Sequence, residues 1–220
     1  MKNIFITATN TNVGKTYTTL KLLHTLHDKG YKVGAYKPIE TGVDGVPVDA
    51  SLLLQTCQEL NPDFKVITVN DICPIQLSLP AAPYVASCGK TIDFDKITES
   101  YKKIKNYCDI LIIEGAGGLL VPVLKDFYII DFIKLFDAHA LLVTHDKLGS
   151  INETLLSLEA LKSRNISHNW CINHFDDTEE FEKITLPFYQ DYFAKIFSLQ
   201  NNLDELTQEL ITNCNRNGDS

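Results

Sequence analysis

The stretch Ala8-Thr9-Asn10-Thr11-Asn12-Val13-Gly14-Lys15-Thr16 decides the fold of this chain. The short apolar run Ile4-Phe5-Ile6 precedes it and is typical of a buried parallel strand. Leucines recur at helical spacing between Tyr17 and Lys29, immediately after it. A strand, a loop ending in Gly-Lys-Thr and a helix together predict a phosphate-binding loop, because backbone amides and the helix N-terminus then face a phosphate.

Lys15 and Thr16 carry the chemistry expected of such a loop. The lysine can reach the β- and γ-phosphates of a nucleotide, and the threonine hydroxyl can ligate Mg²⁺. Five residues, not four, separate Ala8 from Gly14, and alanine stands where the first glycine is usual. This alanine fits only if its position needs no positive φ. Since Gly-Lys-Thr also occurs in ordinary loops that enter a helix, the assignment depends on partners elsewhere in the chain.

Length, charge and hydropathy restrict the class of protein. The 220 residues fit one nucleotide-binding domain over residues 1–220, in which the polar end, residues 213–220, is expected to fray. The formal net charge of −8 argues against a nucleic-acid surface. No apolar run approaches the roughly 18 residues of a membrane span, and the short stretch before the first strand leaves no room for a signal peptide.

The six cysteines are scattered, without a Cys-x-x-Cys pair or a histidine spacing suited to zinc. Several lie in apolar runs, where a free cysteine behaves as a small hydrophobe. This usage predicts a reducing, cytoplasmic location.

A second strand, over 32–36, delivers Lys37 to the edge of the sheet where ligands bind. Pro38 holds Lys37 extended at that strand end. A solvated turn is the alternative for Lys37, but a neighbouring phosphate loop favours a role toward the polyphosphate. Asp49 follows near the start of a helix, where it can cap or begin that helix, or share a metal with Thr16.

The second strong signal is the stretch 109–118, whose apolar run Ile110-Leu111-Ile112-Ile113 predicts a strand buried on both faces. It ends in Glu114 and the segment Gly115-Ala116-Gly117-Gly118, which we expect to form a turn. The carboxylate can hold Mg²⁺, and the glycines allow the backbone to approach phosphate. An acidic residue at a strand end is common, but its occurrence together with Gly-Lys-Thr is informative.

The rest of the chain continues the alternation of strands and helices, which predicts an α/β three-layer sandwich around a mostly parallel sheet, of the P-loop NTPase kind. We expect helices near 93–106, 149–164, 177–183 and 203–211, and strands at 138–144, 169–173 and 194–197. Residues 61–90 read as irregular, with Pro80-Ala81-Ala82-Pro83 as a wall or turn. Leu186-Pro187-Phe188 reads as another turn.

The combination of motifs resembles the dethiobiotin synthetase family, most clearly from Ile4 to Leu156 and weakly after His174. The wide spacing in the phosphate loop is itself a trait of that family. The other pieces that carry the resemblance are Lys37-Pro38-Ile39-Glu40-Thr41-Gly42, Asp49, Glu114-Gly115-Ala116-Gly117-Gly118-Leu119, Pro122 and Gly149-Ser150-Ile151-Asn152.

The resemblance implies an ATP- and Mg²⁺-dependent cyclo-ligase of biotin synthesis. In that reaction 7,8-diaminopelargonate takes up CO₂ as a carbamate on one amine. A carbamate oxygen attacks the γ-phosphate, and the second amine then closes the ureido ring and releases phosphate. The family works as a homodimer, in which the helix that begins at Gly149 serves the other subunit's site.

The resemblance also implies a role for each matching residue. Those at the reacting centre would be Lys15, Lys37 and Thr11. Nucleotide would bind to Asn12, Val13, Gly14, Lys15, Thr16, Tyr17, Asp49, Glu114, Gly115, Ala116, Gly117, Asn173, His174, Leu186, Pro187 and Phe188. Substrate would bind to Lys37, Thr41, Gly149, Ser150, Ile151 and Asn152, and Mg²⁺ to Thr16, Asp49 and Glu114.

Two departures from the family pattern limit the nucleotide assignment. Asn10 and Asn12 stand where acidic residues are common, so the loop is less negative. The region after Asn173 is short, although Leu186-Pro187-Phe188 resembles the turn near the base. Adenine is the family default, and GTP or another nucleotide stays open.

Two other classes share this fold. A partitioning or switch ATPase usually carries a further lysine early in the loop, where this chain has Thr9-Asn10-Thr11. An amidoligase of cobalamin synthesis normally has a long glutaminase domain, for which 220 residues leave no room. A purely structural role would leave the motifs Lys37-Pro38 and Glu114-Gly115 unexplained.

Overall fold

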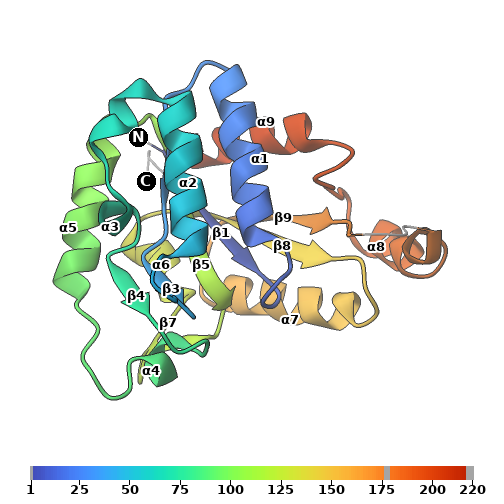
Figure 1. Cartoon of the computed structure of the whole chain (residues 1–220). Coiled ribbons are helices and arrows are strands. Elements are labelled where there is room, and N and C mark those ends of the chain that lie inside the picture. Colours follow the sequence, from blue (N-terminus) through green and yellow to red (C-terminus); the bar gives the residue numbers. More distant parts are fainter. Residues whose placement is uncertain (1, 176–178, 217–220) are drawn as a thin grey trace.

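Five parallel strands form the centre of the fold, which the computed structural model describes for residues 2–175 and 179–216. Their order is β2 (Val33–Tyr36), β5 (Ile110–Gly118), β1 (Lys2–Ala8), β8 (His139–His145) and β9 (His168–Asn173). Each neighbouring pair is parallel. The predicted parallel sheet is therefore confirmed (Figure 1).

Helices cover both faces of this sheet, as the predicted three-layer sandwich requires (Figure 1). On one face lie α1 (Lys15–Asp28), α2 (Val48–Leu60) and α9 (Leu203–Arg216). On the other lie α5 (Phe94–Ile104), α6 (Asp131–Leu135) and α7 (Ser150–Ser163). The two sets separate because right-handed crossovers from β1 toward β2 and from β8 toward β9 run in opposite directions across the sheet.

The core fills the space between sheet and helices. The apolar run of β5, Ile110 to Ile113, is fully buried, as the continuous hydrophobic pattern predicted. On the α5 side Tyr36 meets Phe136 edge to face, with ring centroids 5.7 Å apart, and its hydroxyl donates to the carbonyl of Ile97. This packing fixes the position of β2, and with it the position of Lys37 just beyond its end.

Residues 61–90, which the sequence predicts to be irregular, contain only short elements. These are η1 (Pro62–Val66), α3 (Val69–Ile72), β4 (Ile75–Leu77) and α4 (Pro83–Ala86), and the short strand β3 (Ile39–Thr41) lies before α2. β3 and β4 pair in parallel beside the main sheet. Pro83 is the first residue of α4. Proline is tolerated at this position because residues in the first turn of a helix donate no intrahelical hydrogen bond. Beyond α5 follow η2 (Lys105–Tyr107) and the antiparallel pair β6 (Pro122–Leu124) and β7 (Phe127–Tyr128).

The glycine-rich turn expected after Glu114 is wrong in part, because β5 continues through Gly118. The register with β1 shifts after Glu114, and Gly118 then pairs with Ala8. Gly117 has φ 68°, which explains the shift without ending the strand. Main chain of β5 therefore runs beside the phosphate loop.

The predicted turn at Leu186-Pro187-Phe188 is wrong, because these residues begin α8 (Leu186–Tyr192). A π-helical segment, η3 (Phe181–Thr185), leads directly into it. Proline is tolerated here because it stands in the first turn of α8, where a missing amide costs no intrahelical bond. The short acidic helix expected near 177–183 is confirmed in part, because residues 179–180 are helical and lead into this π-helical segment, whereas residues 176–178 lie outside the described residues.

The last elements also differ from expectation. Residues 194–197 form no strand, and one parallel bridge joins Ile172 to Ser198 beside them. The helix predicted at 203–211 is confirmed but continues to Arg216, into the segment expected to fray. Contacts explain the extension, since the amide of Asn213 donates to Asn169 and the thiol of Cys214 donates to the carbonyl of Asn3. In the part of the chain described, no helix is long and apolar enough to span a bilayer.

Candidate active site

The phosphate loop joins β1 to α1 in the predicted strand–loop–helix arrangement. Ala8 is the last residue of β1 and has extended backbone, so alanine meets no steric obstacle there. Gly14 has φ 98°, and a side chain on it would also collide with the amide nitrogen of Asn173. Glycine is thus required at this position, directly before the helix.

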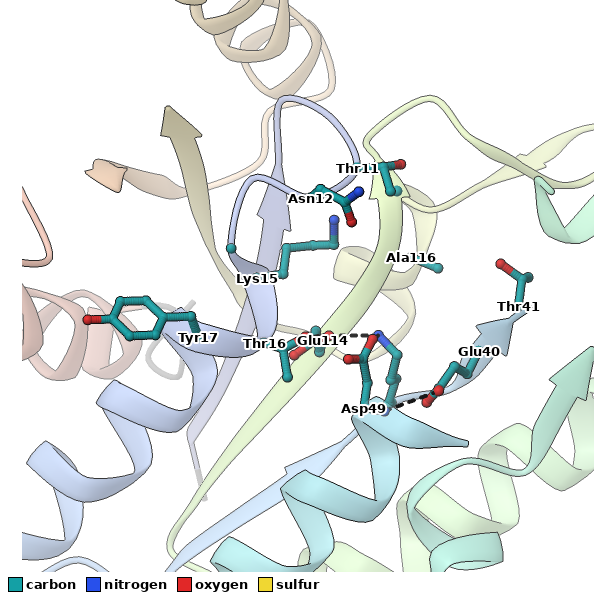
Figure 2. Close-up of a pocket in the computed structure, with 13 residues that line it drawn as sticks. Thr11, Asn12, Lys15, Thr16, Tyr17, Glu40, Thr41, Asp49, Glu114 and Ala116 are labelled. Atoms are coloured by element: carbon teal, nitrogen blue, oxygen red, sulfur yellow. Dashed lines mark hydrogen bonds and ion pairs between the residues drawn. The ribbon is translucent and has the colours of Figure 1, made fainter. Parts of the chain in front are cut away.

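A cavity of about 450 Å³ lies at the carboxyl ends of β1, β2 and β5, where an open parallel sheet binds ligands. It contains most of the residues that the sequence singled out, and Figure 2 shows the labelled ones converging from the phosphate loop, α1, α2, β3 and β5. The lining consists of Thr11, Asn12, Gly14, Lys15, Thr16, Tyr17, Lys37, Glu40, Thr41, Asp49, Glu114, Ala116 and Gly117.

Lys37 is the most enclosed charge in this cavity. Its Nζ lies 2.6 Å from Oε1 of Glu114 and 3.5 Å from Oδ2 of Asp49, and it donates to the carbonyl of Gly115. Burial alone would lower the pKa of Lys37, but the adjacent Glu114 and Asp49 carboxylates outweigh burial and raise it. Lys37 is therefore a fixed positive charge, and the solvated-turn alternative is wrong.

Lys15 has the opposite electrostatic character. Its Nζ donates to the carbonyl of Asn10 at 3.2 Å. Burial, followed by repulsion from Lys37, lowers the pKa of Lys15 to about 8, although Glu114 and Asp49 oppose this effect. An added phosphate would supply the anionic partner that this ammonium lacks.

Glu114 is 1% exposed and accepts hydrogen bonds from three side chains. Oε1 accepts from Thr16 at 3.0 Å and from Lys37, and Oε2 accepts from Thr19 at 2.9 Å. These bonds fix the carboxylate beside the Thr16 hydroxyl, and Figure 2 shows Asp49 facing the same point. One hydroxyl and two carboxylates are hard oxygen donors, which fit Mg²⁺ bound together with nucleotide phosphates.

Asp49 does not cap α2. The N-cap residue is Pro47, and Asp49 lies in the first turn with a half-exposed side chain paired to Lys37. The Glu40 carboxylate accepts from the backbone amides of Asp49 and Ala50 instead, at 3.2 and 2.9 Å. The capping alternative for Asp49 is therefore wrong, and Glu40 takes that role.

Asn173 ends β9 and lies beside the phosphate loop, and His174 follows it. The Asn173 amide donates to the carbonyl of Val13 at 3.0 Å and accepts from Nε2 of Gln200 at 3.0 Å. His174 pairs with Asp146 at 3.2 Å and contacts the Phe181 ring. Asn173 thus ties the end of β9 to the loop that would hold the phosphates.

Besides Val13, Gly115, Asn173 and His174, two predicted groups do not line the cavity. Leu186, Pro187 and Phe188 lie on α8, where the Phe188 ring stacks on Tyr192 with centroids 5.4 Å apart. Gly149, Ser150, Ile151 and Asn152 lie at the start of α7. Ser150 is 1% exposed, so its side chain is not free to meet a ligand, whereas Asn152 is exposed.

Sequence reasoning missed three residues that support the site, namely Thr19, Glu40 and Gln200. Thr19 stands one helical turn after Thr16, a spacing that could have identified it. Glu40 lies within the motif Lys37–Gly42, but the motif alone does not indicate its role. For Gln200 the chain offered no signal, because its partners are 26 and 27 residues away.

A second cleft, of about 320 Å³, adjoins the cavity and shares Thr11, Thr41, Ala116 and Gly117 with it. Its other walls are Val121 and the stretch Pro80–Pro83, so the proline-rich stretch is a wall as predicted. The small apolar side chains of this wall suit an aliphatic chain.

The phosphate loop, the order of the strands and the two lysines that line the cavity define a P-loop nucleoside triphosphatase. Solved structures with this fold include the MinC:MinD cell division complex of Aquifex aeolicus, at TM-score 0.54 and 16% identity over 99% of this chain and 86% of that one. A plasmid partition protein of Borrelia burgdorferi reaches TM-score 0.53 at 11% identity, with 98% and 96% covered. At these identities the likeness shows the fold alone.

Sequence relatives are much closer, and a family model of an AAA domain matches residues 2–175. The ATP-dependent dethiobiotin synthetase BioD of Sulfurovum sp. (strain NBC37-1) is 49% identical over 96% of this chain and all of its own length. That of Wolinella succinogenes is 44% identical over 96% and 99%, and that of Helicobacter pylori 35% over 85% and 88%. This chain belongs to the ATP-dependent dethiobiotin synthetase family.

Proposed function

We propose that this chain converts 7,8-diaminopelargonate, CO₂ and ATP to dethiobiotin, ADP and phosphate. The observation that carries the proposal is the cavity itself. It holds the ammonium groups of Lys15 and Lys37 beside the Thr16 hydroxyl and the Glu114 carboxylate, in a chain of this family.

The reaction has three steps in this proposal. One substrate amine attacks CO₂ and loses a proton to give a carbamate. A carbamate oxygen then attacks the γ-phosphorus, so that ADP leaves and a carbamic–phosphoric anhydride forms. The second amine attacks the carbonyl carbon, closes the ureido ring and expels phosphate.

Negative charge gathers on the carbamate and on the transferred phosphoryl group during these steps, and the two lysines are placed to stabilise it. Lys37 stays protonated because of its carboxylate neighbours, so it offers a constant charge. Lys15 is charged near neutral pH but loses its proton as the pH rises past about 8, since its pKa is lowered to about 8. Electrostatic stabilisation of this kind commonly lowers the barrier to phosphoryl transfer more than any other effect.

Mg²⁺ would be held by Thr16, Glu114 and Asp49, where it would neutralise phosphate charge. Hydrogen bonds within the protein already orient two of these oxygen donors. Glu114 is fixed by Thr19 and Lys37, and the Thr16 hydroxyl points at its carboxylate. The oxygens are therefore organised before any ligand arrives.

The second cleft would take the aliphatic chain of the substrate. Thr41 and Thr11 stand where this cleft meets the lysines, so they would contact the carbamate or the amines. The substrate carboxylate would then lie at the far end of the cleft. We assign it to the first amides of α7 in a second copy of this chain, because the start of α7 does not line its own cavity.

This assignment requires a homodimer, and we place that dimer in the cytoplasm. The six free cysteines suit a reducing compartment. ATP is the nucleotide of the family, and we propose adenine as the base, with GTP to be tested beside it. The base would lie on the Asn173 side of the loop and not at α8, since Asn173 alone of these groups bonds the phosphate loop.

The test is nucleotide hydrolysis with and without diaminopelargonate and ¹³C-bicarbonate, with dethiobiotin followed by mass spectrometry. We expect ADP release to depend on both substrates and one ¹³C to appear in the product. A partitioning-type ATPase, the alternative on this fold, would hydrolyse ATP without either substrate and form no labelled product. That result would overturn the proposal.

A further inference from the structure

The start of α2 is unusual because the helix begins beside the cavity without a cap of its own. Pro47 occupies the N-cap position and has no side-chain acceptor to offer. The preceding loop contains Gly42 and Gly45, both with φ 75°, a backbone conformation that glycine adopts more easily than other residues. Asp49 therefore follows a loop that by itself constrains it little.

Glu40 supplies the missing constraint from a different element. It lies in β3, is 7% exposed, and spans to α2 with both carboxylate oxygens. One oxygen accepts from the amide of Asp49 at 3.2 Å and the other from the amide of Ala50 at 2.9 Å. Figure 2 shows Glu40 and Asp49 side by side. The Asp49 carboxylate also forms an ion pair with Lys37.

Both oxygens of Glu40 are engaged by backbone, so this carboxylate is not a free base toward a substrate. Its bonds hold the main chain of Asp49, whose carboxylate lies 3.5 Å from the ammonium of Lys37. Apart from α2 itself, the described residues give Asp49 one further contact, the ion pair of its side chain with Lys37, and that side chain is 44% exposed. A bond between backbone and a buried carboxylate is also stronger than one between neutral groups.

We infer that Glu40 is a positioning residue for the metal end of this site, which holds the Asp49 carboxylate in place by capping α2 from β3. The inference rests on the proposed role of Asp49 toward Mg²⁺. It also explains Glu40, a residue of the Lys37–Gly42 motif that takes no part in the proposed reaction steps.

The experiment measures binding of Mn²⁺, as a paramagnetic substitute for Mg²⁺, by electron paramagnetic resonance with a non-hydrolysable ATP analogue present. The variants are Glu40→Ala, Glu40→Gln, Asp49→Asn and the double variant Glu40→Ala/Asp49→Asn. Asp93→Ala is the matched control. Asp93 caps α5 by accepting two hydrogen bonds from backbone amides, each 3.1 Å long, and it does not line the cavity.

We expect Glu40→Ala to weaken Mn²⁺ binding by about tenfold, as loss of an outer-sphere support commonly does. Glu40→Gln should lose less, since its amide oxygen still accepts one of the two bonds. The double variant should bind no more weakly than Asp49→Asn, because Glu40 acts through Asp49. Asp93→Ala should lower Tm but leave Mn²⁺ binding unchanged.

Three results would overturn the inference, and they differ in meaning. Parental Mn²⁺ binding by Glu40→Ala at a lowered Tm would leave Glu40 as a stabilising cap only. If Glu40→Ala weakened Mn²⁺ binding by the same factor in the parent and in the Asp49→Asn variant, Glu40 would act independently of Asp49. Parental binding by Asp49→Asn would remove Asp49 from the metal, and the metal part of the proposed function would fail with it. Should Glu40→Ala not fold, Glu40→Gln decides by the same comparisons.

Discussion

The ammonium of Lys37 and the carboxylate of Glu114 form an ion pair of 2.6 Å in which the two side chains are 4% and 0% exposed. Few ion pairs in a protein are so completely removed from water, and both partners carry further bonds. Removing one partner of such a pair leaves a buried charge, which costs more than a lost surface contact. The pair thus links the stability of the fold to the chemistry of the site.

Lys37→Ala should abolish turnover and also lower the free energy of unfolding by about 3–5 kcal/mol, because Glu114 is left buried and unpaired. The double variant Lys37→Ala/Glu114→Gln should recover much of the stability, since no unpaired charge remains, but no activity. Urea unfolding and steady-state turnover measure the two effects. A Lys37→Ala protein with near-parental turnover at saturating substrate would remove Lys37 from the reaction.

Nucleotide affinity should fall as pH rises above about 8, because the pKa of Lys15 is lowered to about 8 and the neutral amine no longer attracts phosphate. Linkage gives a slope approaching tenfold per pH unit if nucleotide binding requires protonated Lys15. Calorimetric titrations in buffers of different ionisation enthalpy would show proton uptake in this range. Lys15→Arg keeps its charge at every such pH, so it should bind without the slope.

The stability effect of the same group has the opposite sign. The folded-state pKa of Lys15 is below its unfolded value, so the unfolded chain binds more protons between about pH 8 and pH 10.4. The contribution of Lys15 to stability should therefore rise with pH across this window. A stability difference between parent and Lys15→Met that stays constant from pH 7.5 to 10 would contradict the lowered pKa.

Gln200→Leu should raise the nucleotide KM about three- to tenfold, a loss of roughly 0.6–1.4 kcal/mol that matches one or two hydrogen bonds. The Gln200 amide donates to Oδ1 of Asn173 and to the carbonyl of His174, and so holds the Asn173 amide toward Val13 of the phosphate loop. Because this role concerns binding, kcat at saturating nucleotide should stay within about twofold. Gln208→Leu, on the exposed side of α9, is the matched control. A change in kcat alone would contradict the role assigned to Gln200.

The sequence predicted the layers of this fold and most of its cavity because those features follow from local patterns. The apolar run of β5 and the strand–loop–helix at Lys15 each specify one element and the point where it ends. Parallel strands then bring Lys15, Lys37 and Glu114 to one edge. No contact between distant residues had to be known for this result.

The failures share a physical origin, since each depends on contacts that spacing does not encode. Pro187 reads as a turn residue, yet a preceding π-helical segment delivers it to the first turn of α8. Asp49 reads as a cap, but Glu40 reaches α2 from β3 and takes that place. The glycines after Glu114 read as a turn, although pairing with β1 extends the strand.

The proposed dimer gives the most specific test of how the site is built. Ser150 is buried, so a bulky residue there would disturb the packing of α7 itself. Asn152 is exposed, and Asn152→Trp blocks the first turn of α7 without filling the core. If the substrate carboxylate binds to those amides, Asn152→Trp should raise the substrate KM strongly while the nucleotide Kd stays parental. Unchanged substrate KM would contradict the carboxylate assignment.

Complementation then decides whether the site is shared between subunits. Asn152→Trp protein keeps Lys37, and Lys37→Gln protein keeps its helix start, so a heterodimer would contain one intact site of its two. Subunits carrying different affinity tags allow heterodimers to be purified and their exchange verified. We expect such heterodimers to recover about half of the parental turnover, since one of two symmetric sites is complete. If α7 serves its own chain instead, the two defects fall on separate sites and purified heterodimers stay as inactive as both parents, which excludes a shared site.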